Sequence, residues 1–362
     1  MNDINLDDPQ VYNQYDPEGM LERIHEMPEL CQRAWQMAMN FNFPQGYSRV
    51  NKVVISGMGG SAIGSDLVNS LVASEAKLPI LIYRDYELPA FIDGQTLVIA
   101  SSYSGMTDET LFSFEQALET ESKKLVITTG GKLKTLAEER NIPVFSFDYE
   151  AQPRAALPFN FLSILGFLQT LGFIRDKSVD VREMVRILQE LSQKINEGVP
   201  VSHNPAKQLA NRLYGHLPVI YGAGILSEVA HRWKTQLNEN SKAWAFYEVF
   251  PELNHNAVVG YQYPPELASK MVVVLLRSAL LPQRIQLCYQ VTCQLLERAK
   301  INYQFVDGEG TSPLSQMMSL VLFGDYISYY MAILYKTDPT PIKAIDYLKE
   351  QLAQGGDKEA KG

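Results

Sequence analysis

Two turns rich in glycine, serine and threonine follow short apolar runs in the first half of the chain. Residues 56–65 read SGMGGSAIGS after the run VVI, and residues 101–107 read SSYSGMT after TLVIA. In a parallel sheet such turns lie at the carboxyl ends of strands, where ligands bind, and the amides that open the next helix favour an anion. We therefore expect a site for a compact phosphate dianion, made by Gly59, Gly60, Ser61, Ser102, Ser104 and Thr107.

Other phosphate ligands fit parts of the same pattern. Gly57, Gly59 and Ala62 satisfy the loose G-x-G-x-x-A form of a dinucleotide turn, and Asp85 follows the next strand, where a ribose-binding acid is wanted. A P-loop is excluded because no Gly-Lys-Ser/Thr follows the turn. Ordinary helix capping explains one or two hydroxyls of the second turn but not all three.

Short apolar runs separated by amphipathic segments must position these turns. Strands are expected at 52–56, 79–83, 96–101, 124–129 and 143–147, and the alternation restarts with 217–224, 270–278 and 302–307. Such runs, apolar on both faces, are typical of parallel sheets covered by helices. The fold class is therefore α/β, with two doubly wound units.

The same pattern divides the chain into five parts. We expect a helical arm over 1–45, interrupted at Pro28, a first α/β domain over 46–150 and a helical connector over 151–204. A second α/β domain over 205–335 and a C-terminal helix and tail over 336–362 complete the prediction.

Composition limits the function classes. The net charge is −9 and no basic run occurs, so nucleic acid is not an expected partner. Three cysteines without a C-x-x-C pair favour neither a disulfide framework nor a structural metal site. The polar N-terminus does not resemble a signal peptide, and we expect no apolar run near the ~18 to 20 residues that span a bilayer. A cytoplasmic location is expected.

GMGGSAIG together with SSYSGMTDET resembles a sugar isomerase (SIS) domain, a module that binds phosphosugars. The chain as a whole resembles the bifunctional phosphoglucose/phosphomannose isomerases, through QPRAALP, QLNENSKAWAFYEVFPELNHN and TPIKAIDYLKEQL. Met106 departs from the pattern, because many such loops carry Asn there. The resemblance implies two SIS domains, a hexose 6-phosphate substrate, a homodimer, and no metal or redox cofactor.

Aldose–ketose isomerisation needs a base that moves a proton between C1 and C2, an acid/base for the ring oxygen, and a cation for the developing oxyanion. The resemblance implies that Glu239 is the base, with Glu252 as the competing carboxylate. Arg154 follows the last strand of the first unit, at its ligand-binding end, so its guanidinium is a candidate for holding the enediolate. The alternative for Arg154 is an ion pair within the connector.

The resemblance also implies that His255 opens the sugar ring and is contributed by the partner subunit. We expect its neighbours Asn254 and Asn256 to fix its tautomer. Lys349 resembles the family's lysine that works with this histidine, and Lys343 is the alternative.

The resemblance further implies that Thr340 leaves room at C2 for both the glucose and the mannose epimer. The expected function is thus interconversion of glucose 6-phosphate and mannose 6-phosphate with fructose 6-phosphate. Two rivals stay open: a non-catalytic sugar-phosphate-binding regulator, and a nicotinamide-dependent oxidoreductase that uses the glycine turn.

Overall fold

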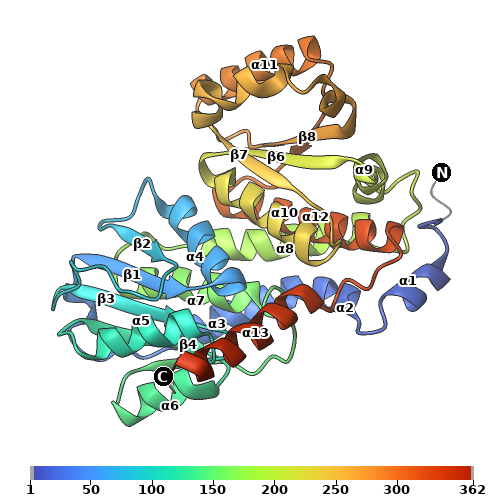
Figure 1. Ribbon diagram of the computed structural model, residues 1–362. Helices are drawn as coiled ribbons and strands as arrows, with labels where there is room; N and C mark the ends of the chain where they lie inside the picture. Colours follow the sequence, from blue (N-terminus) through green and yellow to red (C-terminus); the bar gives the residue numbers. More distant parts are fainter. Residues whose placement is uncertain (1–3, 360–362) are drawn as a thin grey trace.

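Two parallel sheets form the framework of the protein, as seen in a computed structural model that describes residues 4–359 (Figure 1). The first sheet has the order β2-β1-β3-β4-β5, with β1 Lys52–Gly57, β2 Ile80–Tyr83, β3 Thr96–Ser101, β4 Lys123–Thr128 and β5 Val144–Ser146. The second has the order β7-β6-β8-β9, with β6 Leu217–Ala223, β7 Phe246–Phe250, β8 Met271–Arg277 and β9 Asn302–Asp307. The expected α/β class is confirmed.

Helices cover both faces of the first sheet because its strands bury side chains in both directions. Ala100 and Val126 pack against α5 (Asp108–Leu118) and α6 (Gly131–Glu139). Ile99 and Ile127 belong to the main core, which includes α3 (Met27–Met39), α4 (Gly59–Val72) and α7 (Leu157–Thr170). The helical arm before α3 consists of α1 (Pro9–Tyr15) and α2 (Met20–His25).

The second sheet is covered in the same way. Val273 and Leu275 pack under α11 (Gln283–Arg298), whereas Val274 and Leu276 join the main core with α10 (Ser227–Glu239) and α12 (Pro313–Leu334). Helices α8 (Ser178–Ile195) and α9 (Pro205–Leu213) pack on α12. One continuous apolar core therefore joins the two sheets.

Helix α12 differs from the expectation that no long apolar run occurs. By length and composition it could cross a membrane, and it is the one such helix in the described part of the chain. It is buried from Leu314 to Leu334, however, and packs against α8, α9 and α10. The Trp233 indole of α10 packs beside Gly324 and donates to the Leu320 carbonyl at 2.8 Å. These contacts make α12 the central core helix.

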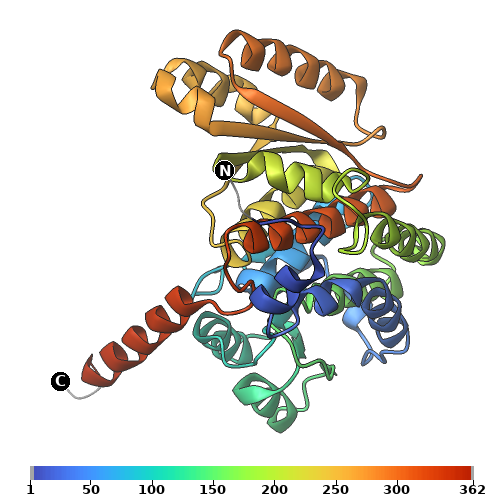
Figure 2. The same cartoon turned by 90° about the vertical axis from the view of Figure 1, so that its right-hand side faces the viewer.

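Two further elements bear on the site. The sequence pattern does not predict β7, an edge strand whose residues FYEVF are mostly half-exposed, followed by the 3₁₀ turns η3 (Glu252–His255), η4 (Ala257–Gln262) and η5 (Pro265–Lys270). Other 3₁₀ turns are η1 (Tyr47–Arg49) and η2 (Gly224–Leu226). The last helix, α13 (Lys343–Glu359), extends away from the body of the molecule (Figure 2).

Candidate active site

The two hydroxyl-rich turns meet at the carboxyl edge of the first sheet. Ser61, in the first turn of α4, accepts a hydrogen bond through Oγ from the Tyr103 amide at 3.2 Å. Ser102 Oγ lies 2.8 Å from Thr107 Oγ1 and accepts from the Gly105 amide at 3.1 Å. Ser61 and Ser102 are buried, and no side chain caps the first turn of α5. The edge thus presents hydroxyls beside the free amides of a helix N-terminus, an arrangement suited to an anion.

Gly105 is required by the shape of the second turn. Its φ is +65°, and a Cβ at this position would collide with the Gly130 carbonyl. Ser104 and Met106 flank it and are exposed, with the Ser104 Oγ accepting from the Met106 amide at 3.2 Å. The turn therefore keeps Ser102 inside and turns Ser104 outward.

The glycine turn lies directly against the segment that carries Arg154. A Cβ on Gly60 would come within 3.0 Å of the Pro153 carbonyl oxygen and 3.3 Å of the Arg154 amide nitrogen. Gly59, which begins α4, has a φ of +50°. Close backbone contact at Gly60 thus places the first hydroxyl-rich turn next to Arg154.

Arg154 is buried and contacts two segments through its guanidinium. Nε donates to Asn240 Oδ1 at 2.7 Å, and Nη2 donates to the carbonyls of Pro339 and Thr340, both at 2.8 Å. Nη1 lies 3.5 Å from Glu239 Oε2. Burial lowers the pKa of Arg154, with Glu239 opposing the shift. The arginine therefore brings the end of α10 and the Thr340 segment to one point.

A second buried ion pair, between Arg232 and Asp325, lies next to the Arg154 backbone. Arg232 of α10 donates to the Arg154 carbonyl and to Asp325 Oδ2 of α12, both at 3.0 Å. Gln236 donates to Asp325 Oδ1 at 2.8 Å. Burial raises the pKa of Asp325, and Arg232 opposes the shift. The backbone of Arg154 is thus fixed as firmly as its side chain.

Four buried polar atoms of this network lack a hydrogen-bond partner among the described residues. Arg232 Nε and Gln236 Oε1 belong to the supporting contacts, and Arg154 Nη1 and Thr340 Oγ1 lie where the two segments meet. Buried polar groups are normally satisfied, so such atoms need an explanation. Arg154 Nη1, Thr340 Oγ1 and the Glu239 carboxylate, which is 27% exposed, form a cluster that a hydroxylated ligand can complete.

His255 lies at the carboxyl ends of the strands of the second sheet, whereas Glu239 lies at their amino ends. Glu239 ends α10 before β7 begins, whereas His255 ends η3 after β7. The five residues of β7 span about 16 Å between these ends. His255 is exposed, and the structure does not bring it to Glu239 of the same chain.

The expectation that Asn254 and Asn256 fix the His255 tautomer is wrong. Asn254 Nδ2 donates to Thr292 Oγ1 of α11 at 2.9 Å, and Asn256 Nδ2 donates to Glu252 Oε1 at 3.0 Å. Both amide nitrogens therefore donate away from the His255 ring, and Asn254 Oδ1 has no hydrogen-bond partner among the described residues. Glu252, the competing carboxylate, is exposed on the same edge as His255.

The two candidate lysines lie on α13. Lys343 begins this helix and Lys349 follows within it, and both are exposed. Lys343 comes three residues after Thr340, whose carbonyl accepts from Arg154 Nη2, whereas Lys349 lies further along α13, which extends away from the rest of the molecule (Figure 2).

Asn240 and Lys242 belong to the cluster but were not among the expected site residues. Asn240 is buried and bridges Arg154 to Ser328 Oγ of α12. Lys242 Nζ donates to the carbonyls of Glu239, Asn240 and Pro339 at 2.6, 3.3 and 3.0 Å. Their position beside Glu239 in NENSK was the available signal, but contacts to backbone carbonyls leave no pattern in a sequence.

One group of side chains could hold a metal ion elsewhere. Asp66 of α4 and Glu228 and His231 of α10 place their ligand atoms within 4.8 Å of one another. Arg84 already forms an ion pair with Asp66 there. This group lies near the start of α10, two turns or more from Glu239.

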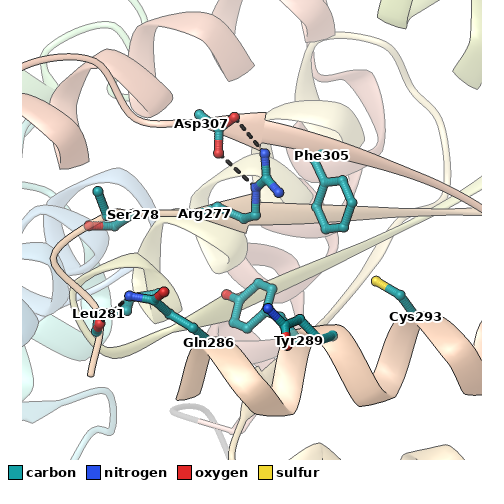
Figure 3. A pocket seen from close by; sticks show the side chains of 10 residues that line it. Arg277, Ser278, Leu281, Gln286, Tyr289, Cys293, Phe305 and Asp307 are labelled. Carbon is teal, nitrogen blue, oxygen red and sulfur yellow. Dashed lines mark hydrogen bonds and ion pairs between the residues drawn. The ribbon is translucent and has the colours of Figure 1, made fainter. Parts of the chain in front are cut away.

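A cavity beside the second sheet is also separate from the cluster. This cavity, of about 510 Å³, lies between α11 and the ends of β8 and β9 (Figure 3). Arg277, at its wall, is paired with Asp307 through two hydrogen bonds of 2.7 Å and lies over the Phe305 ring. None of the expected site residues lines this cavity.

Comparison with known proteins decides the family. The chain is 40% identical to a bifunctional phosphoglucose/phosphomannose isomerase of Caldicellulosiruptor bescii over 92% of its own length and 99% of that protein. It belongs to the bifunctional phosphoglucose/phosphomannose isomerase family. The protein of that name from Aquifex aeolicus is 37% identical, over 83% of this chain and 90% of the other.

Two further comparisons agree with this family. Residues 202–352 match the family described as Bacterial phospho-glucose isomerase C-terminal SIS domain. The fold resembles that of tagatose-6-phosphate ketose/aldose isomerase from Escherichia coli, with a TM-score of 0.68 and 16% identity, over 90% of this chain and 96% of the other. The expected family and fold are thereby confirmed.

Proposed function

We propose that the protein interconverts glucose 6-phosphate and mannose 6-phosphate with fructose 6-phosphate through a cis-enediol, without a metal. One observation carries the proposal: Glu239 Oε2 lies 3.5 Å from Arg154 Nη1, and Arg154 follows the residue that packs on Gly60. A carboxylate and a cation are thus held together beside a turn suited to phosphate. This is the combination that aldose–ketose isomerisation requires.

In this proposal the first sheet binds the phosphate. The side chains of Ser61, Ser102 and Thr107 and the first amides of α5 hold the dianion, with Gly59 and Gly60 allowing its close approach. Ser104 is exposed at the rim and contributes from outside. The reacting carbons then extend toward Arg154.

The proton moves at the other end of the sugar. Glu239 removes the proton from C2 of the aldose and returns it to C1, and Arg154 Nη1 stabilises the negative charge on the enediolate oxygen. We assign the buried Thr340 hydroxyl, which has no partner among the described residues, to the region of C2 where the epimers differ. Ring opening needs a proton moved from O1 to the ring oxygen, which we assign to His255 and Lys349.

A homodimer supplies the missing acid/base group. His255 and Glu239 lie at opposite edges of one sheet, so His255 of the partner subunit is the candidate for each site. Exposed apolar side chains near His255 and along α13 would be covered in such a pair: Val259, Tyr263, Leu287, Val291, Tyr347, Leu348 and Leu352.

Incubation with fructose 6-phosphate, a chelator and no added cofactor tests this function. Both aldose 6-phosphates should form, and Glu239→Gln should abolish their formation while Glu252→Gln keeps it. Binding of fructose 6-phosphate without turnover would support the regulator instead. Turnover that depends on a nicotinamide cofactor would support the oxidoreductase, and turnover abolished by the chelator would contradict a metal-free reaction.

A further inference from the structure

Lys242 sits where two cations share one carbonyl. Lys242 Nζ and Arg154 Nη2 both donate to the Pro339 oxygen, at 3.0 and 2.8 Å. The other two Lys242 contacts go to the carbonyls of Glu239 and Asn240, at the end of α10. One ammonium thus ties the turn that carries the carboxylate to the segment that carries Thr340.

The backbone at Lys242 has the left-handed conformation that commonly follows a helix. Its φ is +57°, and Asn141, Lys300 and Lys336 adopt the same conformation just after α6, α11 and α12. The conformation alone therefore does not mark a functional site. The inference rests instead on the ammonium, whose three donors all go to carbonyls, one of them that of Pro339 in a separate segment.

We propose that Lys242 is a positioning residue, which fixes Glu239 and Thr340 relative to each other and so sets the rate of proton transfer and the ratio of the two C2 epimers. The inference rests on the proposed isomerase function. Lys242 touches no expected phosphate residue in the described part of the chain, so its loss should change events at C1 and C2 and leave phosphate binding intact.

The charges around Lys242 make this tie sensitive to pH. The Lys242 side chain as a whole is exposed, but desolvation of its ammonium, with Arg154 next in size, lowers its pKa to about 8, while Asp338 and Glu239 oppose the shift. His216 and Lys234 line the cavities on either side of it. The neutral amine has two N–H donors instead of three, so one of the three carbonyl contacts is lost as pH rises through about 8.

Kinetics of Lys242→Met and Lys242→Arg test the proposal. At pH 7, Lys242→Met should lose about 10- to 100-fold in kcat with little change in KM, because a small misplacement of the base is enough for such a loss. It should also change the mannose-to-glucose ratio. Wild-type kcat should fall above pH 8, Lys242→Arg should keep its kcat to higher pH, and Lys242→Met should show no such fall. Lys234→Met, at a lysine of α10 five residues before Glu239, is the matched control.

Hydrogen exchange separates this inference from the function on which it rests. Amides of residues 239–243 and 337–342 should exchange faster in Lys242→Met, and in wild type above pH 8 after correction for intrinsic rates. If the wild type converts no hexose phosphate, the isomerase function fails and exchange still decides the positioning role. Unchanged exchange, or a loss confined to KM, would overturn it. A matching result for Lys242→Gln shows that the effect is not a folding defect of one variant.

Discussion

Arg154 Nη1 and Glu239 Oε2 lie 3.5 Å apart, although one residue belongs to the first α/β unit and the other to the second. The arginine follows β5 of the first sheet and the glutamate ends α10 beside the second. The separation is longer than an ordinary N–H···O hydrogen bond, so the guanidinium does not occupy the carboxylate fully, as the proposed role of Glu239 as a base requires. The site is therefore made where the two units meet.

Replacement of Arg154 should affect both turnover and folding. Arg154→Lys keeps the charge but cannot reach Asn240, Pro339 and Thr340 together, because an ammonium lacks the planar fork of a guanidinium. We expect kcat to fall by about 10²- to 10³-fold, as for the loss of an oxyanion stabiliser, with a lower Tm. Steady-state kinetics and thermal unfolding check this. A variant with wild-type kcat would show that Arg154 is a structural ion-pair partner only.

Ser102→Ala should raise KM more than it lowers kcat. Ser102 Oγ contacts Thr107 Oγ1 and the Gly105 amide, so its loss weakens the proposed phosphate site at the far end from the reacting carbons. Inorganic phosphate should also inhibit the variant less than the wild type. Ser70→Ala, on α4 beyond the turn, is a matched control that should leave KM unchanged. An effect on kcat alone would contradict the phosphate role.

Mixed dimers test whether His255 acts in the partner's site. Glu239→Gln and His255→Ala should each be inactive as pure proteins. After subunit exchange, a mixed dimer holds one site with both native groups, so about a quarter of wild-type activity should return if the symmetric pairing is random. If Glu239 and His255 act within one subunit, no site in the mixture is complete and no activity returns.

Asp66 should make stability depend on pH. Burial raises the pKa of Asp66 to about 6, with Arg84 opposing and Glu228 reinforcing the shift. A raised folded-state pKa means stability that is fully present below the ordinary value near 4 and is lost as pH rises through about 6. Asp66→Asn should therefore gain Tm relative to wild type at pH 7.5 and little at pH 4. An equal difference at both pH values would contradict the assignment.

Apolar runs predict most strands because burial on both faces demands it. Residues such as Val53, Ile99 and Val274 are fully buried, and their runs coincide with strands of the parallel sheets. Strand β7 escapes prediction because an edge strand with one exposed side mixes Glu248 with aromatic residues. Helix α12 shows the opposite difficulty. Its length and apolar composition also fit a membrane span, and only its packing shows that it is a core helix.

The candidate site is less accessible from sequence. Arg154 and Glu239 carry side chains whose chemistry can be anticipated, and the fold brings them together. Lys242 acts on backbone carbonyls, which every residue has, so nothing in the pattern distinguishes it. The asparagines around His255 look like partners for the ring, but folding places Thr292 and Glu252 closer to their amides.

The contact between Gly60 and Pro153 has a consequence for substrate length. Because no side chain separates the two backbones, their direct contact sets the distance from the hydroxyl-rich turns to Arg154 and Glu239. A pentose 5-phosphate, one carbon shorter, would reach the carboxylate with the wrong carbon or not at all, and even a misplacement of about 1 Å is costly. Discrimination between six- and five-carbon sugars would then come from the spacing of the scaffold, without a residue dedicated to it.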